Sequence, residues 1–481
     1  MAHPRAIIMA AGKGTRLKSQ LPKVLHPLMG KPLLQRVLET LPLINIEEAC
    51  IIVGHQADQV KDSLVNFQLP FSYTTALQDP QLGTGHAVQQ VHLQCPQWQN
   101  FSGTALILSG DVPLMRAETL SHLLKQHAQQ NNALTVLAAT CSDPTGYGRI
   151  VCGNSSPDNP KQSAVKKIIE HKDATPQEQA ITLVNTGIYA VNWALISPLL
   201  MQLSNHNKQA EFYLTDVVAL AVNANLSVGM AHLDDATEML GVNARSDLAQ
   251  CHSVLNQRTL KQLMVNGVSI PYPQLTVISP EVSIGPDSTV LPGCLLEGDI
   301  TIGNDCTIGP NTIMNGTVRA GDNVKVIQSV IRDTIIGSHV SIGPFAQLRD
   351  QVTLADTVHI GNFVEIKQSS IDSHTNVAHL AYVGNATLGN TVNIGAGTIT
   401  ANYDPIRDIK SETQIGNGAK IGSNTVLVAP VSVASEASVA AGSVITKDVS
   451  EGSLAIARGR QTEIEGWVKK TKAQATEQVK T

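Results

Sequence analysis

The chain has 481 residues, and its 34 Lys and Arg against 39 Asp and Glu give a formal charge of −5. That length suits about three domains, and a hydrophobic content of 42% excludes a wholly disordered chain. The small negative charge provides no electrostatic surface for nucleic acid or membrane lipid. No apolar run reaches the roughly 18 residues of a membrane span, and the seven cysteines contain no Cys-x-x-Cys pair. We expect a soluble cytoplasmic protein whose partners are small molecules.

The first half of the chain alternates short apolar runs with helical patterns. Because the apolar runs are short and uninterrupted, they predict buried parallel strands joined by crossover helices, a Rossmann-like α/β domain. Ligands of such sheets bind beyond the carboxyl ends of the strands. The predicted strands are Ala6–Ala11, Ala49–Val53, Tyr73–Leu77, Ala105–Leu108 and Leu134–Ala139, and helical patterns cover Leu33–Leu41 and Leu120–Gln129.

The pattern changes at Ser246, which can cap a helix that Gly267 would end. Residues 246–266 are predicted to form a linker helix, with the last core helix of the first domain as the alternative. The predicted domains are therefore residues 1–245, this helix, and residues 267–481.

Beyond the helix, aliphatic residues recur at every sixth position. This period fits neither a helix nor an amphipathic strand, but it is typical of hexapeptide parallel β-helices, which are left-handed and close one triangular coil with three repeats. The low aromatic content of 3% agrees with such a repetitive core, and a β-sandwich is the alternative. Residues 276–450 would make about ten coils, roughly 45 Å in height. The predicted inward positions are Ile278, Ile284, Val290, Leu296, Ile302 and Ile308, then, after an offset, Val318, Val324, Val330, Ile336, Ile342, Leu348, Leu354, Ile360 and Ile366, and finally Ile415, Ile421, Leu427, Val433, Val439 and Ile445.

A glycine-rich segment, Gly12-Lys13-Gly14, follows the first predicted strand. Such a turn exposes backbone N–H groups that can face phosphate oxygens, although many glycine-rich turns have no such role. It is neither a Walker A loop nor a dinucleotide fingerprint, because Ile7 and Leu17 stand where those motifs need glycine.

Residues after other predicted strands support a phosphate site. Lys23 follows Pro22, and Gln78 could pair with the edge of a nucleobase near the turn Gly83-Thr84-Gly85. Asp111 follows the strand Ala105–Leu108. A lone Asp there is usually a helix cap or a turn residue, but opposite a phosphate-binding loop a Mg²⁺ ligand is the better interpretation.

The segments Ala-Ala-Gly-Lys-Gly-Thr-Arg from Ala10 and Pro-Lys-Val-Leu-His from Pro22 resemble those of the sugar-nucleotide pyrophosphorylases. Over essentially the whole chain, the sequence resembles the family of bacterial bifunctional enzymes that combine N-acetylglucosamine-1-phosphate uridyltransferase with glucosamine-1-phosphate acetyltransferase. This resemblance implies UTP and acetyl-CoA as co-substrates, Mg²⁺ as cofactor, and a product used for peptidoglycan and lipopolysaccharide.

The resemblance also implies roles for residues of the first domain. Uridine would lie against Met9, Ala10, Ala11, Gly12, Gln78, Gly83 and Thr84; phosphates would be held by Arg16 and Lys23; Mg²⁺ by Asp111 and Asn243; and N-acetylglucosamine by Gly148, Glu170 and Asn185. The sugar phosphate would attack the α-phosphorus of UTP without a protein nucleophile, because its oxygen is already ionised. Catalysis would then consist of alignment and charge neutralisation by the metal, Arg16 and Lys23.

Between Gln347 and Tyr403, polar residues interrupt the aliphatic repeat. Each alone could be a solvated corner residue, but residues of stacked coils can converge on one groove. The resemblance implies His379 as general base for the amine, oriented by Glu365, since an imidazole accepts protons near neutral pH. It further assigns Arg349 and Lys367 to the substrate phosphate, Tyr382 and Asn393 to the sugar, and Ala396, Asn402, Tyr403, Ser423, Ala441 and Arg458 to acetyl-CoA. The implied assembly is a homotrimer whose β-helices share the acetyl-transfer site between subunits.

Several segments depart from the family pattern. Ser109 replaces an aromatic hydroxyl, Asp350-Gln351 replaces Pro-Gly, Ala378 replaces Gly, and the loop after Asp404 is longer by about two residues. The rival hypotheses are a single-activity nucleotidyltransferase with an oligomerising β-helix and a protein that keeps both folds without catalysis. The tail after Trp467 is predicted to be disordered.

Overall fold

The computed structural model describes residues 3–153 and 165–478. The chain divides into two compact units, Met1–Leu255 and Asn256–Thr481. The division falls inside helix α9 (Arg245–Val265), ten residues after the predicted domain end at residue 245. None of the helices in the described ranges combines the length and the apolar character that crossing a membrane requires.

The first unit is built on a nine-stranded sheet. The strands β1, β4, β5 and β6 pair in parallel, as do β7 and β11, so the predicted parallel strands are confirmed. Along its main path the sheet contains β11 (Val228–Leu233), β7 (Leu134–Thr140), β10 (Leu183–Asn192), β6 (Thr104–Ser109), β1 (Arg5–Met9), β4 (Glu48–Val53) and β5 (Ser72–Leu77).

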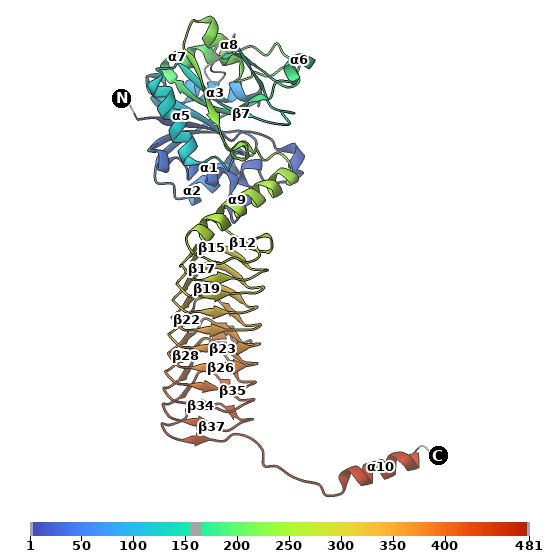
Figure 1. The fold of residues 1–481 in the computed structure, drawn as a ribbon. Helices are drawn as coiled ribbons and strands as arrows, with labels where there is room; N and C mark the ends of the chain where they lie inside the picture. The colour runs from blue at the N-terminus through green and yellow to red at the C-terminus, as the bar shows by residue number, and fades with distance from the viewer. Residues whose placement is uncertain (1–2, 154–164, 479–481) are drawn as a thin grey trace. The chain divides into compact units, whose positions relative to one another are not determined.

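Helices cover both faces of this sheet (Figure 1). Ile7 of β1 belongs to an apolar cluster with residues of α3, α7 and α8, whereas its neighbours Ala6 and Ile8 contact residues of α1, α2 and α5 on the other face. This alternation is the consequence of side chains pointing to opposite faces along a strand. The helices are α1 (Leu33–Leu38), α2 (Ala57–Asn66), α3 (Thr84–Gln94), α4 (Pro96–Gln99), α5 (Ala117–Gln129), α6 (Pro176–Gln179), α7 (Trp193–Leu200) and α8 (Asp216–Asn223).

The strand β10 departs from the expected all-parallel sheet. It runs antiparallel to both β6 and β7, and it also pairs with β8 (Arg149–Cys152), which in turn pairs with β9 (Val165–Ile169). The register shifts between Asn185 and Tyr189, where Gly187 has a φ of 81°. Asn185 comes directly before this irregularity and pairs with Ala138, near the carboxyl end of β7.

The second unit is a parallel β-helix whose coils stack along one axis (Figure 1). One face has ten strands, one from each coil, in agreement with the predicted number of coils. These are β14 (Thr289–Val290), β16 (Thr307–Ile308), β18 (Lys325–Val326), β20 (Ser341–Ile342), β23 (His359–Asn362), β26 (Asn376–His379), β29 (Asn393–Ile394), β34 (Lys420–Ile421), β37 (Ser438–Val439) and β39 (Leu454–Ala455).

The other two faces belong to one sheet of sixteen strands. They are joined at the start of the β-helix by long strands, β15 (Leu295–Ile302), β17 (Ile313–Ala320) and β19 (Val330–Ile336), with β12 (Val277–Ile278) and β13 (Ser283–Ile284) beside them. One branch continues as β21 (Gln347–Arg349), β24 (Glu365–Lys367), β27 (Tyr382–Gly384), β30 (Ile399–Ala401), β35 (Val426–Val428) and β38 (Val444–Ile445), and the other as β22 (Val352–Leu354), β25 (Ser370–Ile371), β28 (Ala386–Leu388), β33 (Thr413–Ile415) and β36 (Val431–Val433).

The aliphatic repeat does contain an offset, but its predicted position directly after Ile308 is wrong. The six-residue frame continues without a break through Met314 and Val326, and then takes two five-residue steps to Ile331 and Ile336, all of which are buried. The predicted inward residue Val330 is 40% exposed, whereas Ile331 is completely buried. Each six-residue repeat also buries a second residue, which stands two positions before the first, as Val318 and Val324 do. The predicted frame followed these second residues instead of the first ones.

Two more five-residue steps follow, from Ile366 to Ile371 and from Val383 to Leu388, and a longer insertion lies between Ala401 and Thr413. There the chain leaves the β-helix as a short hairpin of β31 (Tyr403–Asp404) and β32 (Ile409–Lys410). It returns in register, because Ala386 pairs with Thr413 and Leu388 with Ile415.

The tail was predicted to be disordered, but residues Trp467–Gln478 form helix α10. The side chains of Trp467 and Val468 are exposed on it.

Candidate active sites

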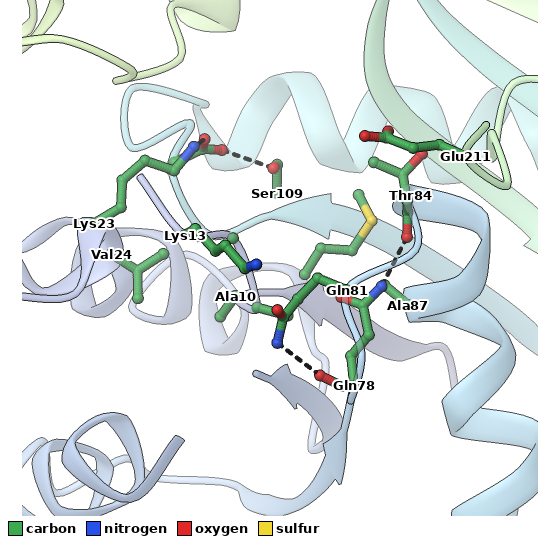
Figure 2. A pocket seen from close by; sticks show the side chains of 15 residues that line it. Ala10, Lys13, Lys23, Val24, Gln78, Gln81, Thr84, Ala87, Ser109 and Glu211 are labelled. Atoms are coloured by element: carbon green, nitrogen blue, oxygen red, sulfur yellow. Dashed lines mark hydrogen bonds and ion pairs between the residues drawn. The ribbon is translucent and has the colours of Figure 1, made fainter. Parts of the chain in front are cut away.

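A cavity of about 460 Å³ opens at the carboxyl ends of β1, β5 and β6. Figure 2 shows Lys23 and Ser109 on one side of it and Gln78, Gln81 and Thr84 on the other. Nine of the residues predicted from the sequence line this cavity: Met9, Ala10, Ala11, Gly12, Lys23, Gln78, Gly83, Thr84 and Asp111.

The glycine-rich loop packs against Lys23. Gly14 has a φ of 61°, and a Cβ atom added to it would lie 2.7 Å from Cβ of Lys23. Any larger residue would therefore be strained and would displace Lys23. At Gly12 an added Cβ would lie 3.8 Å from Cε of Lys23, so the ammonium group extends over the loop's exposed backbone. A backbone and a cation that face the same space form an anion-binding arrangement.

Two oxygen acceptors surround the Lys23 ammonium. It forms an ion pair with the Asp111 carboxylate and donates to Oδ1 of Asn243 at 3.2 Å. The second carboxylate oxygen, Oδ1 of Asp111, accepts from the Ser109 hydroxyl at 2.7 Å. Asp247 fixes the Asn243 backbone, because the N–H groups of Asn243 and Ala244 both donate to Oδ2 of Asp247 at 2.9 Å.

The environment of Asp247 keeps it ionised. Burial alone would raise its pKa, but the hydrogen bonds from Asn243, Ala244 and Ser246 outweigh burial and lower the pKa overall. An ionised carboxylate is the stronger acceptor, so the loop that presents Asn243 is held firmly.

The donor set around Lys23 fits Mg²⁺. The carboxylate oxygen of Asp111 and the amide oxygen of Asn243 both contact the Lys23 ammonium. Both kinds of oxygen are also ligands that Mg²⁺ accepts. Within residues 3–153 and 165–478, no group of three or more His, Cys, Asp or Glu side chains could hold a metal. A Mg²⁺ ion at Asp111 and Asn243 would therefore need further ligands from substrate phosphates and water.

The opposite wall of the cavity is held by hydrogen bonds between distant segments. Nε2 of the buried Gln78 donates to the carbonyl of Gly83 at 2.8 Å. Gly83 has a φ of 110°, and an added Cβ would lie 2.6 Å from the carbonyl oxygen of Phe212. The hydroxyl of Thr84 accepts from the Leu214 N–H at 3.1 Å. The close packing of Gly83 against Phe212 leaves no room for a side chain at position 83.

The three residues predicted to contact a sugar lie together. The Asn185 N–H donates to the Gly148 carbonyl at 2.9 Å, and Nδ2 of Asn185 donates to the Tyr189 hydroxyl at 2.7 Å. A Cβ added to Gly148 would lie 3.6 Å from Oε1 of Glu170, so the backbone of Gly148 lies close to the Glu170 carboxylate.

Glu170 is an unusual carboxylate. Its Oε1 accepts from the Thr215 hydroxyl at 3.0 Å. Burial raises its pKa, the Thr215 hydrogen bond opposes that shift, and the nearby Asp216 and Asp173 carboxylates add to it. A buried acceptor with a raised pKa is suited to a neutral polar ligand such as a sugar hydroxyl or amide.

Five predicted residues of the first unit are not among those that line the cavity, namely Arg16, Gly148, Glu170, Asn185 and Asn243. Six lining residues had not been assigned to the site, namely Lys13, Val24, Gln81, Ala87, Ser109 and Glu211. Arg16 is exposed on the 3-10 turn Thr15–Leu17. Lys13 is part of the glycine-rich motif, which could have indicated it. Glu211 comes from a distant segment, and no local pattern marks it.

In the second unit, three adjacent strands bring four predicted residues onto one face. Arg349 of β21 pairs in register with Lys367 of β24, and Glu365 of β24 pairs with Tyr382 of β27. Nε and Nη2 of Arg349 donate to Oε1 of Glu365 at 2.9 and 2.6 Å. This contact raises the pKa of the guanidinium further, chiefly through the Glu365 hydrogen bond. The face therefore presents two fixed cations.

The partner of His379 is not the one predicted. Nδ1 of His379 lies 2.6 Å from Oδ1 of Asn362, which occupies the same position one coil earlier. Glu365 accepts hydrogen bonds from Arg349 instead. Because an amide oxygen only accepts, Nδ1 carries the proton and Nε2 of the exposed imidazole is free to accept one.

The residues predicted for acetyl-CoA divide into two groups. Asn362 and His379 occupy the same corner position of successive coils, and Ala396, Ser423 and Ala441 occupy that position in the coils that follow; we call this set the corner column. Backbone hydrogen bonds join its levels: the Asn424 N–H donates to the Ala396 carbonyl at 2.7 Å, and the Gly442 N–H donates to the Ser423 carbonyl at 2.8 Å. The guanidinium of Arg458 donates to the carbonyl of Ala441 at 2.8 Å, so a cation stands at the end of this column.

The remaining assignments lie elsewhere on the β-helix. Asn402 is buried, and its Nδ2 donates to Oδ1 of Asn385 at 2.6 Å. Tyr403 begins the hairpin and donates to Oδ1 of Asp408 at 3.1 Å. Asn393 lies on β29, on the face that precedes the His379 corner. Sequence reasoning missed Asn362 and the contacts of Asp350 described below.

Comparisons with known proteins cover both units. Residues 5–236 match the family model for nucleotidyl transferase, and residues 277–316, 333–368 and 412–447 match that for the bacterial transferase hexapeptide (six repeats). A solved UDP-glucose pyrophosphorylase in complex with UDP-glucose is 15% identical, with a TM-score of 0.43, over 53% of this chain and 100% of that chain.

Full-length relatives carry both parts. The chain is 44% identical to a protein of Synechococcus sp. named Bifunctional protein GlmU, over 96% of this chain and 98% of that one. It is also 44% identical to a protein of the same name from Exiguobacterium sp., over 97% and 99% of the two chains. At this identity and coverage, the chain belongs to the family of bifunctional GlmU proteins.

Proposed function

We propose that the two units carry out consecutive steps of UDP-N-acetylglucosamine synthesis. The second unit transfers acetyl from acetyl-CoA to glucosamine 1-phosphate, and the first transfers uridylyl from UTP to N-acetylglucosamine 1-phosphate and releases pyrophosphate. The observation that carries this proposal is the presence in one chain of two sets of groups. One is the cavity with Lys23 and Asp111, beside which Asn243 lies. The other is on the β-helix, where Arg349 and Lys367 lie on one face and His379 lies at the corner of another. Neither a single-activity nucleotidyltransferase nor a protein without catalysis accounts for both sets of residues.

In uridylyl transfer, the sugar phosphate oxygen attacks the α-phosphorus of UTP, and the bond between the α-phosphorus and the bridging oxygen breaks. Gln78 and Gly83 would hold the uracil ring, and Glu170 and Asn185 the N-acetylated sugar. Lys23, paired with Asp111 in the free protein, would exchange that partner for a phosphate oxygen. Asp111 and Asn243 would then hold Mg²⁺, which supplies charge neutralisation for the departing pyrophosphate.

In acetyl transfer, Nε2 of His379 accepts a proton from the amine of glucosamine 1-phosphate. The amine nitrogen attacks the thioester carbonyl, the carbon–sulfur bond breaks, and the departing sulfur takes the proton from Nε2 of His379, so that coenzyme A leaves as the thiol. Arg349 and Lys367 would hold the sugar phosphate, and the column that ends at Arg458 would hold the coenzyme.

A homotrimer and a cytoplasmic location complete the proposal. Phe345 and Phe363 stack with ring centroids 5.4 Å apart and are more than half exposed, as is Leu380 next to His379. Such an apolar column beside a reactive group is typical of a buried subunit contact. UTP and acetyl-CoA, the co-substrates, are cytoplasmic metabolites.

The test is incubation with glucosamine 1-phosphate, acetyl-CoA, UTP and Mg²⁺, followed by free thiol and by pyrophosphate. We expect His379→Ala to lower thiol release by at least about a hundredfold, while pyrophosphate release from supplied N-acetylglucosamine 1-phosphate persists. Asp111→Ala should abolish pyrophosphate release and spare thiol release. If both activities fell together with the circular dichroism unchanged, the assignment of separate sites would be wrong.

A further inference from the structure

Asp350 follows Arg349 in an unusual turn. Asp350 and Gln351 have φ values of 62° and 69°, so two successive non-glycine residues adopt the left-handed conformation. Such a conformation is uncommon outside glycine, although Asp and Asn tolerate it best. The turn directs the Asp350 carboxylate over the face that carries Arg349 and Lys367.

The carboxylate of Asp350 contacts both cations of that face. Its Oδ2 accepts from Nη1 of Arg349 at 2.8 Å and lies 3.6 Å from Nζ of Lys367. Its Oδ1 accepts from the guanidinium of Arg332, one strand earlier on β19. The hydrogen bond from Arg332, helped by the charge of Arg349, lowers the pKa of Asp350. The group is therefore an anion at neutral pH.

These contacts neutralise the cations before any substrate arrives. Arg349 already shares its charge with Glu365 and Asp350, and Lys367 shares its charge with Asp350. One carboxylate oxygen that faces a guanidinium and an ammonium stands where an oxygen of a bound phosphate would stand. A phosphate dianion must displace it or be repelled by it.

We propose that Asp350 is a tethered competitor of the substrate phosphate and sets the affinity of the acetyl-transfer site for its phosphorylated sugar. This rests on the proposed function, which assigns Arg349 and Lys367 to that phosphate. On binding, Oδ2 of Asp350 leaves the two cations while Oδ1 stays with Arg332, which lies on the other side of the carboxylate. The same device excludes inorganic phosphate, which lacks the sugar contacts needed to compete.

The test compares the wild-type chain with Asp350→Asn in thiol release from acetyl-CoA and glucosamine 1-phosphate. Because two partly exposed ion pairs are lost, we expect the KM for glucosamine 1-phosphate to fall by about three- to tenfold. Inhibition by inorganic phosphate should strengthen by a similar factor. The kcat and the KM for acetyl-CoA should stay within about twofold, since the reacting groups are unchanged. In high salt the difference in KM should shrink, because exposed charges are screened.

Asp299→Asn is the matched control. Asp299 pairs with Arg319 on the same sheet, but it lies on β15, three strands from β21. It makes the same change of charge, and we expect it to leave every kinetic constant as in the wild type. Thermal melting of both variants checks folding, and Asn is well tolerated at a positive φ.

The outcomes separate this inference from the function on which it rests. A KM for glucosamine 1-phosphate that is unchanged in Asp350→Asn overturns the inference, and so does a higher one, which would show that Asp350 holds Arg349 in place. If the wild-type chain releases no thiol from these substrates, the proposed acetyl transfer is wrong and the inference falls with it.

Discussion

Replacement of Asn362 by Ala tests how the general base is oriented. The change removes the amide oxygen that lies 2.6 Å from Nδ1 of His379. A hydrogen bond of this kind contributes about 0.5–1.5 kcal/mol net, which corresponds to about two- to tenfold in rate. We therefore expect kcat of acetyl transfer to fall by about this factor. The full loss in His379→Ala should be at least about a hundredfold, because there the base itself is missing.

The assay is steady-state thiol release at saturating acetyl-CoA, with glucosamine 1-phosphate varied. Asn362→Asp keeps an acceptor oxygen and should retain most of the kcat. Glu365→Gln should change the KM for glucosamine 1-phosphate instead of kcat, because Glu365 accepts from Arg349. A wild-type kcat in Asn362→Ala, or a larger loss of kcat in Glu365→Gln, would refute the orientation by Asn362.

Two further predictions concern stability. Burial raises the pKa of Glu170 in the folded state above its unfolded value, so the folded state binds the proton more tightly and stability falls as pH rises through that window. Glu170→Gln should therefore be more resistant to urea than the wild type at pH 7.5, and this gain should vanish below about pH 4; an equal gain at both pH values would contradict this reasoning. Ile331→Ala should lower the unfolding free energy by about 2–5 kcal/mol, since Ile331 is completely buried, whereas Val330→Ala should cost less than about 1 kcal/mol. Urea unfolding measures both losses. If Val330→Ala lowered the unfolding free energy as much as Ile331→Ala, Val330 would point inward, as the sequence had predicted.

The sequence predicted those parts of the fold that residues close together in the chain determine. Strands such as β4 and β7 follow from their apolar runs, and the glycine-rich loop follows from its composition. The direction of β10 could not be predicted, because pairing with β6 and β7 depends on contacts distant in sequence. Because each repeat buries two residues, the sequence near Val330 also fitted more than one six-residue frame.

Among the site residues, too, those within a local motif were predicted, and those that reach the site through contacts distant in sequence were not. Motifs identified Lys23 and Asp111, but not Glu211, which reaches the cavity from a segment without a motif of its own. Asn362 stands 17 residues before His379, one coil away, so it could have been found only once the length of that coil was known. The contacts of Asp350 depend on a turn of two left-handed residues, which the letters Asp-Gln do not suggest.

The return of the hairpin to its original register has a consequence for how this chain can vary in length. Extra residues at a corner, like those between Ala401 and Thr413, project outward and leave the pairs above and below intact. A single residue deleted inside a strand has no such outlet, since the side chains that follow it in that strand would exchange inside for outside. We therefore expect homologous chains to gain and lose residues at corners, and the levels that bear Arg349, Lys367 and His379 to keep their spacing.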